Sequence, residues 1–131
     1  MKRVVIDTNV LISSALSPEG TPARIVDLIS DHKIQLFYCM AIIDEYKRVF
    51  AYDKLHISPQ IQERAIKKII KLGILTDPVV SDIPMPDEDD RIFYDTAKDN
   101  GATLITGNTK HYPSESFIMT PSGFLDSLEN V

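Results

Sequence analysis

Short apolar segments rich in β-forming residues alternate with helix-type segments along the whole chain, and this alternation constrains the fold more than any other feature. We expect five strands, at "RVVID" (3–7), "IQLFYC" (34–39), "ILTD" (74–77), "TLIT" (103–106) and "FIMT" (117–120). Strands that alternate with helices favour a parallel sheet with helices on both faces. We therefore predict an α/β fold, a three-layer α/β/α sandwich around a central parallel sheet of about five strands.

Helix-start signals lie between these strands. The expected helices begin just after Asp7, at "PARIVDLIS" (22–30), at "AIIDEYKRVF" (41–50), at Pro59, at about Asp87 and at "PSGFLDSLEN" (121–130). Thr21, Ser58 and Thr120 each stand directly before a proline, which is typical of an N-cap residue followed by proline at the first helical position. Gly73 and Gly101 are expected to end the fourth and fifth of these helices.

The composition suits a single domain that spans residues 1–131. Hydrophobic residues make up 44% of the chain and charged residues 25%, which is ordinary for a soluble globular protein. The net charge of -5 is unevenly distributed, because residues 1–74 carry 11 Lys/Arg and 8 Asp/Glu, whereas residues 75–131 carry 3 and 11. An acidic pole beside a basic surface would suit a metal site next to a polyanion.

The cysteine content and the apolar runs indicate where such a protein would work. Cys39 is the only cysteine, so no internal disulfide is possible and a reducing compartment is expected. No secretory signal is visible, and the longest apolar run, "LFYCMAII" (36–43), is too short to span a bilayer. We therefore expect a cytoplasmic protein that does not enter a membrane.

Oxygen-bearing side chains follow several of the expected strands. Asp7 ends the first strand, Asp44 and Glu45 fall in the first turn of the helix after the second strand, and an acidic run opens the helix that follows the third. Asn108 comes just after the fourth strand. Because sites in open parallel sheets form outside the carboxyl ends of the strands, these side chains are expected to meet at one edge.

Each of these residues also has a simpler interpretation. Asp7 could cap a helix with its carboxylate, and Glu45 could be a solvated helix residue. Asp87 and Asp90 resemble a capping box, and Asn108 could be a turn residue. These interpretations explain the residues singly but do not explain why all four segments bring an oxygen ligand to the same edge.

A cation would resolve the repulsion among clustered carboxylates, some of which would otherwise hold a proton. Mg²⁺ and Mn²⁺ prefer hard oxygen ligands, and they assist phosphodiester hydrolysis by polarising the phosphate and activating water. A helical wheel over the acidic run "DEDD" (87–90) places Asp90 and Asp89 at the two margins of the buried arc, with Glu88 facing solvent. The wheel leaves both Asp90 and Asp89 as candidates.

Taken in order, these motifs resemble those of PIN-domain ribonucleases, the toxin components of many toxin–antitoxin pairs. The similarity lies in "VVIDTNVLISS", "IIDEYKRVF", "DEDDRIFYDTAKDNGATLITGN" and "FIMTPSGFLDSL". It implies a PIN-like α/β fold and an endoribonuclease that uses Mg²⁺ or Mn²⁺. It also implies an RNA substrate, an antitoxin protein as partner, and a homodimer.

The resemblance also implies roles for individual residues. The catalytic and metal-binding positions fall on Asp7, Glu45, Asp90 and Asn108, and the family spacing to Ala97 selects Asp90 over Asp89. Asn108 stands where an aspartate is frequent, so it supplies an oxygen without a negative charge. The residues expected to orient these ligands are Thr8, Asn9, Asp87, Asp89 and Thr106.

Basic side chains are weaker candidates for contact with RNA. Arg64, Lys67, Lys68 and Lys71 recur at helical spacing, on the face opposite Ile61, Ala65, Ile69 and Leu72. This stripe could hold RNA phosphates or could simply be a solvated helix face. Lys110 and His111 follow Asn108 and are better placed to meet a phosphate near the acids.

Two other functions fit parts of the pattern. The first is a non-catalytic PIN-like module that binds RNA or a protein, because Asn108 replaces an acid. The second is a receiver-type signalling domain, which has a similar length, an acidic metal pocket and a threonine after the fourth strand. A receiver also needs a pair of acids after the first strand, whereas this strand ends in "IDTN" with one.

Overall fold

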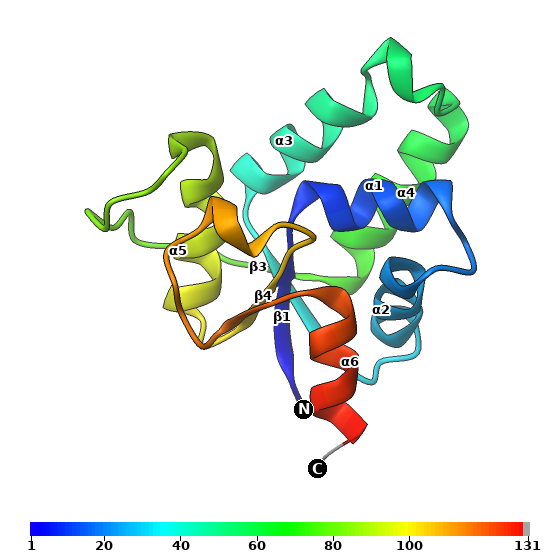
Figure 1. Cartoon of the computed structure of the whole chain (residues 1–131). Helices are drawn as coiled ribbons and strands as arrows, with labels where there is room; N and C mark the ends of the chain where they lie inside the picture. Colours follow the sequence, from blue (N-terminus) through cyan, green and yellow to red (C-terminus); the bar gives the residue numbers. More distant parts are fainter. Residues whose placement is uncertain (130–131) are drawn as a thin grey trace.

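The computed structural model describes residues 1–129 and contains five parallel strands in one sheet, in the order β3-β2-β1-β4-β5 (Figure 1). The strands are β1 (Arg3–Ile6), β2 (Gln35–Tyr38), β3 (Ile74–Leu75), β4 (Thr103–Ile105) and β5 (Ile118–Met119). The predicted α/β fold with a parallel five-stranded sheet is therefore confirmed. Receiver-type domains have the strand order 2-1-3-4-5, so that alternative is wrong.

Six α-helices connect and cover these strands. They are α1 (Thr8–Leu16), α2 (Thr21–Ser30), α3 (Met40–Phe50), α4 (Pro59–Leu72), α5 (Arg91–Asp99) and α6 (Pro121–Glu129). Figure 1 shows α5 on one side of the strands, with α2 and α6 on the other, so the sheet is the middle layer of three. The predicted last helix extended to Asn130, which lies outside the described residues. Within residues 1–129, no helix is both long and apolar enough to cross a membrane.

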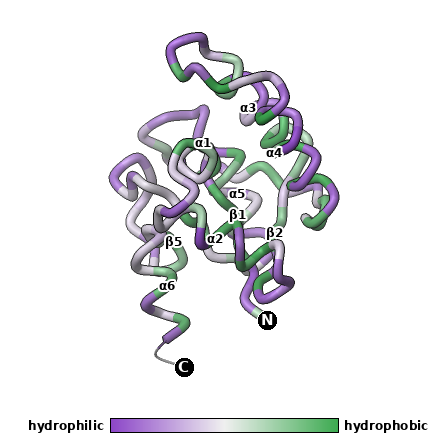
Figure 2. Tube along the Cα trace, turned by 90° about the vertical axis from the view of Figure 1, so that its right-hand side faces the viewer, coloured by the Kyte–Doolittle hydropathy of each residue, from purple (hydrophilic) through white to green (hydrophobic). Residues whose placement is uncertain are grey.

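The core forms around the central strand. Val4, Val5 and Ile6 of β1 are completely buried, as a parallel strand covered on both faces should be. Phe93 of α5 covers one side, and its ring lies 6.1 Å from that of Tyr46 on α3. In Figure 2, hydrophilic residues are concentrated in the peripheral turns. This packing fixes the end of β1, and with it the position of Asp7.

Several predicted helix starts differ from the observed ones. Ser58 caps α4 as expected, because its side chain accepts a hydrogen bond from the backbone N–H of Ile61. In α2, however, Gly20 is the N-cap and Thr21 is already helical. The helix predicted from Asp87 also begins later, at Arg91, after a 3₁₀ turn at residues 88–90.

Backbone geometry explains this late start of α5. The carboxylate of Asp87 accepts the N–H of Asp89 at 3.0 Å, and its carbonyl accepts the N–H of Asp90 at 3.2 Å. The second bond closes the tighter i→i+3 ring of a 3₁₀ turn rather than an α-helical turn. Asp87 is thus a cap, as predicted, but it caps the 3₁₀ turn.

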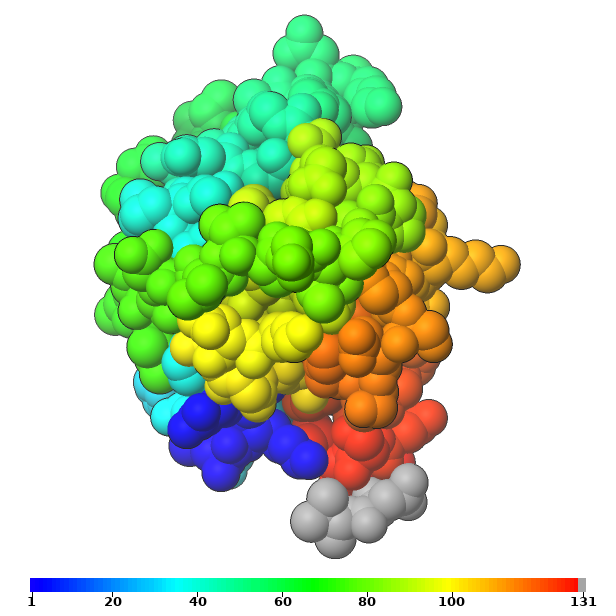
Figure 3. Space-filling model, turned by 90° about the vertical axis from the view of Figure 1, so that its left-hand side faces the viewer, coloured from blue at the N-terminus to red at the C-terminus, as the bar shows by residue number. Residues whose placement is uncertain are grey.

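Residues 76–87 form a strap that runs from β3 across α5 to this acidic turn. Figure 3 shows the strap in green over the yellow helix. The N–H of Ser81 donates to the buried carboxylate of Asp95 at 3.0 Å, and the guanidinium of Arg91 donates to the carbonyl of Ser81 at 2.8 Å. The strap is therefore tied to α5 next to the turn that carries Asp90.

Candidate active site

Asp7 lies where β1 ends, and its carboxylate is held by two hydroxyl groups. Its backbone N–H donates to Ile105 of β4 at 2.9 Å. Its Oδ2 accepts hydrogen bonds from Thr106 Oγ1 and Tyr112 OH, both at 2.9 Å, and the residue is only 7% exposed. Asp7 occupies the N-cap position of α1 but makes no side-chain capping bond. Its interpretation as a capping carboxylate is therefore wrong.

Asp90 presents a second carboxylate, with one oxygen unpaired. Its Oδ2 is buried and has no hydrogen-bond partner. Desolvation, together with the charges of Asp7 and Asp87, raises the pKa of this carboxyl to about 6, although His111 opposes the shift. A buried acceptor without a donor is costly, and a cation or a proton would relieve that cost.

Glu45 supplies the third carboxylate, from α3. The helix begins at Met40, so Glu45 lies in its second turn and not in the first turn as predicted. The side chain is half-buried and forms an ion pair with the guanidinium of Arg48, one turn further along the helix. The solvated-residue interpretation therefore does not describe Glu45 well, because part of its carboxylate faces the protein.

These three carboxylates line a single cavity of about 370 Å³, which we call the acidic cavity. Its other polar lining includes His111, Tyr52 and Lys54. The three acids come from the end of β1, from α3 and from the turn before α5. The structure thus brings together Asp7, Glu45 and Asp90, residues that are separated by 38 and 45 positions in the sequence.

The fourth predicted ligand lies beside this cavity. Asn108 is exposed and lines an adjacent depression together with Asn9 and Gly107. Its side-chain amide is 3.0 Å from the Nε2 of His111, which does line the acidic cavity. Asn108 therefore does not line the acidic cavity itself, but it contacts His111, which does.

The residues expected to orient the acids form a connected network around Asp7. Thr106 donates to Asp7 and accepts from the backbone N–H of Asn108 at 3.1 Å. The side chain of Asn9 accepts from the N–H of Gly107 at 2.9 Å, so it fixes the turn after β4. Thr8 lines the acidic cavity, and its buried hydroxyl has no hydrogen-bond partner.

The two other expected supporting residues belong to the acidic run. Asp87 caps the 3₁₀ turn and is exposed. Asp89 is exposed too, and it does not line the acidic cavity, whereas Asp90 does. The helical wheel left Asp89 and Asp90 as candidates. Of these two, Asp90 alone lines the acidic cavity with Asp7.

The chemistry of the lining fits a hard divalent cation, although the ligands are not drawn together. Within residues 1–129, no three Asp, Glu, His or Cys side chains stand close enough to one another to hold a metal ion. Glu45 is engaged in its ion pair with Arg48. The unpaired, buried Oδ2 of Asp90 beside the charge of Asp7 is nevertheless the environment that an oxygen-seeking cation stabilises.

Two buried tyrosines at the site were not predicted. Tyr112 donates to Asp7, and burial together with the Asp7 charge raises the pKa of its phenol, which therefore remains a donor. The hydroxyl of Tyr46 donates to the carbonyl of Ile6, directly before Asp7, at 2.5 Å. Tyr46 adjoins Glu45 and Tyr112 adjoins His111 in the sequence, which is the one signal that could have pointed to them.

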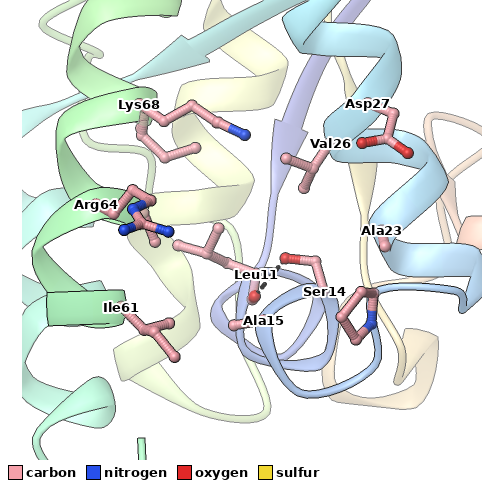
Figure 4. A pocket seen from close by; sticks show the side chains of 12 residues that line it. Leu11, Ser14, Ala15, Ala23, Val26, Asp27, Ile61, Arg64 and Lys68 are labelled. Atoms are coloured by element: carbon pink, nitrogen blue, oxygen red, sulfur yellow. Dashed lines mark hydrogen bonds between the residues drawn. The ribbon is translucent and has the colours of Figure 1, made fainter. Parts of the chain in front are cut away.

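The basic residues predicted to contact RNA fall in two places. Arg64 and Lys68 line a groove between α1, α2 and α4, together with Ile61 and Ala65 (Figure 4). They therefore border the apolar residues of α4 instead of opposing them, which corrects the helical-wheel prediction. The groove and the acidic cavity use different faces of α1.

The other basic residues differ in their surroundings. Lys67 is paired with Glu63 at 2.7 Å, and Lys71 is exposed near the end of α4. Lys110 is exposed on the 3₁₀ turn after Asn108, and its neighbour His111 lines the acidic cavity. Among the predicted cations, His111 is thus the one that reaches the acids.

Comparison with known proteins identifies the family of this fold. Residues 3–110 match the family model of the PIN domain. The chain is also 32% identical over 109 residues to an uncharacterized protein of Methanocaldococcus jannaschii, MJ1680. The aligned region covers 81% of this chain and 70% of that protein.

Two crystal structures have the same fold. One is PAE2754 from Pyrobaculum aerophilum, with a TM-score of 0.64, 13% identity, and coverage of 99% of this chain and 91% of that one. The other is VapBC2 from Rickettsia felis, bound to a DNA fragment from their promoter, with a TM-score of 0.61, 12% identity, and coverage of 90% and 96%. The chain belongs to the PIN domain family.

Proposed function

We propose that the protein is a Mg²⁺- or Mn²⁺-dependent endoribonuclease. The observation that carries this proposal is the convergence of Asp7, Glu45 and Asp90 on one cavity, with an unpaired carboxylate oxygen on Asp90. PIN domains are generally nucleases, and family membership supports the same chemistry here. Asp7, Glu45 and Asp90 would hold the ion, with Asn108 beside them.

The residues of the chain have distinct roles in this proposal. When bound, the ion supplies Lewis acidity, which lowers the pKa of water and neutralises charge on the phosphate. Thr106 and Tyr112 fix the Asp7 carboxylate through their hydroxyl groups. His111 also lines the acidic cavity, and in this proposal its ring contacts a phosphate oxygen of the RNA.

We further propose that the protein is the toxin of a toxin–antitoxin pair and acts as a homodimer. The support for the pairing is the shared fold with VapBC2 of Rickettsia felis and the match to the PIN domain family, and the homodimer follows from the family resemblance alone. Co-expression with the product of a neighbouring small reading frame would test the pairing. A pair should co-purify as one complex and suppress RNA cleavage, and separate elution of the two proteins would contradict it.

Substitution of the acids tests the catalytic proposal. Asp7→Asn and Asp90→Asn should each lower RNA cleavage by about 100-fold or more, since they remove charge from the ion-binding set. Asp89→Asn is the matched control for Asp90, because Asp89 is its exposed neighbour outside the cavity. Cleavage would be followed on labelled RNA with Mn²⁺, alongside thermal unfolding of each variant. Undiminished cleavage by Asp7→Asn would refute the assignment.

A non-catalytic PIN-like module that binds RNA or protein is the rival function. The observations that favour it are the ion pair that engages Glu45 with Arg48 and the absence, within residues 1–129, of three Asp, Glu, His or Cys side chains grouped closely enough to hold a metal ion. Mn²⁺ should raise the thermal unfolding temperature of the wild-type protein if the three acids bind it, because a ligand of the folded state stabilises that state. No shift with Mn²⁺, combined with no cleavage, would favour the rival.

A further inference from the structure

We propose that Tyr52, Arg48 and Lys54 form a subsite on which an unpaired nucleobase of the RNA stacks, next to the acids. This proposal rests on the proposed function, since it takes RNA as the substrate. The subsite would make the protein select single-stranded RNA over paired RNA. None of the three residues was among the candidates derived from the sequence.

Tyr52 lies in the short connection between α3 and the next 3₁₀ turn (53–55), and the backbone holds it on both sides. Its N–H donates to the carbonyl of Val49, and its own carbonyl accepts from the N–H of Leu55, both at 3.1 Å. The residue is 38% exposed and lines the acidic cavity. An aromatic ring on a fixed backbone, open to solvent beside the carboxylates, is thus available to a ligand in the cavity.

Arg48 fixes the orientation of this ring. Its guanidinium lies 5.6 Å from the ring centroid, and its Nη1 donates to the hydroxyl of Tyr52. The other side of the guanidinium is bonded to Glu45. Arg48 therefore connects a predicted metal ligand to the tyrosine, whose ring lines the cavity.

Lys54 supplies a cation that is free to meet a phosphate. Its Nζ lies 5.7 Å from the Tyr52 ring centroid. In the part of the chain that the structure describes, the ion pairs are those of Arg48, Lys67 and Arg91, so Lys54 belongs to none. A flexible, exposed lysine can move from the ring to a phosphate at little cost, which opens the ring face to a base.

Electrostatics explains why such a subsite is needed. Three carboxylates on the cavity wall repel a polyanion, and a bound divalent ion offsets only part of their charge, so groups around the acids must add to the affinity for RNA. Stacking on an aromatic ring contributes affinity without regard to charge, and adjacent cations hold the backbone. An unpaired base has an open π-face, whereas a paired base is covered by its neighbours in the duplex. The subsite should therefore act on single strands.

The decisive experiment compares Tyr52→Ala with Tyr52→Phe. Binding of a fluorescein-labelled single-stranded 12-mer RNA would be measured with Ca²⁺ in place of Mn²⁺, which separates binding from turnover. Tyr52→Ala should raise Kd about 10-fold, and Tyr52→Phe, which keeps the ring, less than about 2-fold. A 2-aminopurine base in the RNA should be quenched by wild type and by Tyr52→Phe but not by Tyr52→Ala.

Lys54→Ala and Lys98→Ala form a matched pair for the cation. Lys98 also lies 5.7 Å from a tyrosine ring, that of Tyr94, but it is outside the acidic cavity. Lys54→Ala should weaken RNA binding several-fold and reduce its salt dependence, whereas Lys98→Ala should leave both unchanged. Equal effects of the two substitutions would overturn the role of Lys54.

Other outcomes separate this proposal from the proposed function. Unchanged RNA affinity in Tyr52→Ala, or an equal loss on a duplex of the same length, would overturn the stacking subsite whatever happens to cleavage. If wild type binds the single strand through Tyr52 but never cleaves it, the subsite stands and the nuclease proposal fails. The Mn²⁺-induced rise in unfolding temperature should be the same in Tyr52→Ala and wild type, because the ring holds no ion.

Discussion

At the scale of single residues, Asp90 is the group whose charge the fold accommodates least well. Its pKa is raised to about 6, above the ordinary value of 3.8, because the site is desolvated and lies near other carboxylates. The folded state therefore binds this proton more tightly than the unfolded state does. That tighter binding stabilises the protein fully below about pH 3.8 and is lost as the pH rises through about 6.

A neutral amide at this position should consequently stabilise the ion-free protein at neutral pH. With EDTA present, Asp90→Asn should raise the unfolding temperature by about 1–3 °C at pH 7.5 and by little at pH 4. Addition of Mn²⁺ should reverse the order, because wild type then gains a ligand that the variant binds poorly. Thermal unfolding across pH measures this. A destabilised Asp90→Asn at pH 7.5 without metal would contradict the expectation.

Tyr112 provides one of the two hydroxyl groups that hold the Asp7 carboxylate. Tyr112→Phe removes one of the two hydroxyl donors from a buried carboxylate, so it should cost about 1–3 kcal/mol in the free energy of unfolding. The matched control is Tyr38→Phe, because the hydroxyl of Tyr38 makes only a 3.5 Å contact, with Ile70. The control should cost less than about 0.5 kcal/mol in urea unfolding. Equal costs would mean that the Asp7 contact is not special.

At the scale of elements, the junction between α4 and β3 leaves no room for a side chain. A Cβ on Gly73 would lie 2.6 Å from the ring of Tyr38 and 2.8 Å from the carbonyl oxygen of Ile69. The chain must turn here from helix into the edge strand, against a buried residue of β2. Gly73, which was predicted to end this helix, is therefore required because the backbone passes too close to the ring of Tyr38 for any side chain.

Gly73→Ala should destabilise the protein by about 1–3 kcal/mol, because the backbone or a buried ring must shift. Gly20→Ala is a milder comparison, since its new Cβ would be 3.3 Å from the carbonyl of Ser17. Both would be measured by chemical unfolding. RNA cleavage per folded molecule should survive in Gly73→Ala, because the junction lies outside the acidic cavity. A stable Gly73→Ala variant would show that Tyr38 moves easily.

At the scale of the whole molecule, the strands and the sheet were predictable because short β-rich runs alternate with helices over the full chain. Asp7 was recognisable because it directly follows a parallel strand. Spacing alone left both Asp89 and Asp90 as candidates, on a helical wheel drawn where the structure has a 3₁₀ turn, and the resemblance to PIN domains selected Asp90. The link between Glu45 and Arg48 was not, because it depends on a choice of side-chain rotamers. Tyr112 escaped notice because the loop between β4 and β5 has no repeating pattern that shows which side chains turn inward.

The hydrogen bonds of Asp7 determine when the site is complete during folding. Its two hydroxyl donors lie 99 and 105 positions further along the chain, and β1 itself pairs with β4 across a similar separation. Contacts between such distant segments form late and slowly, because a long loop must close first. A ribosome must therefore release the segment that carries Tyr112 before Asp7 can be held in place. If the protein cleaves RNA as proposed, a growing chain would remain harmless to the RNA around it until almost all of the domain had been made.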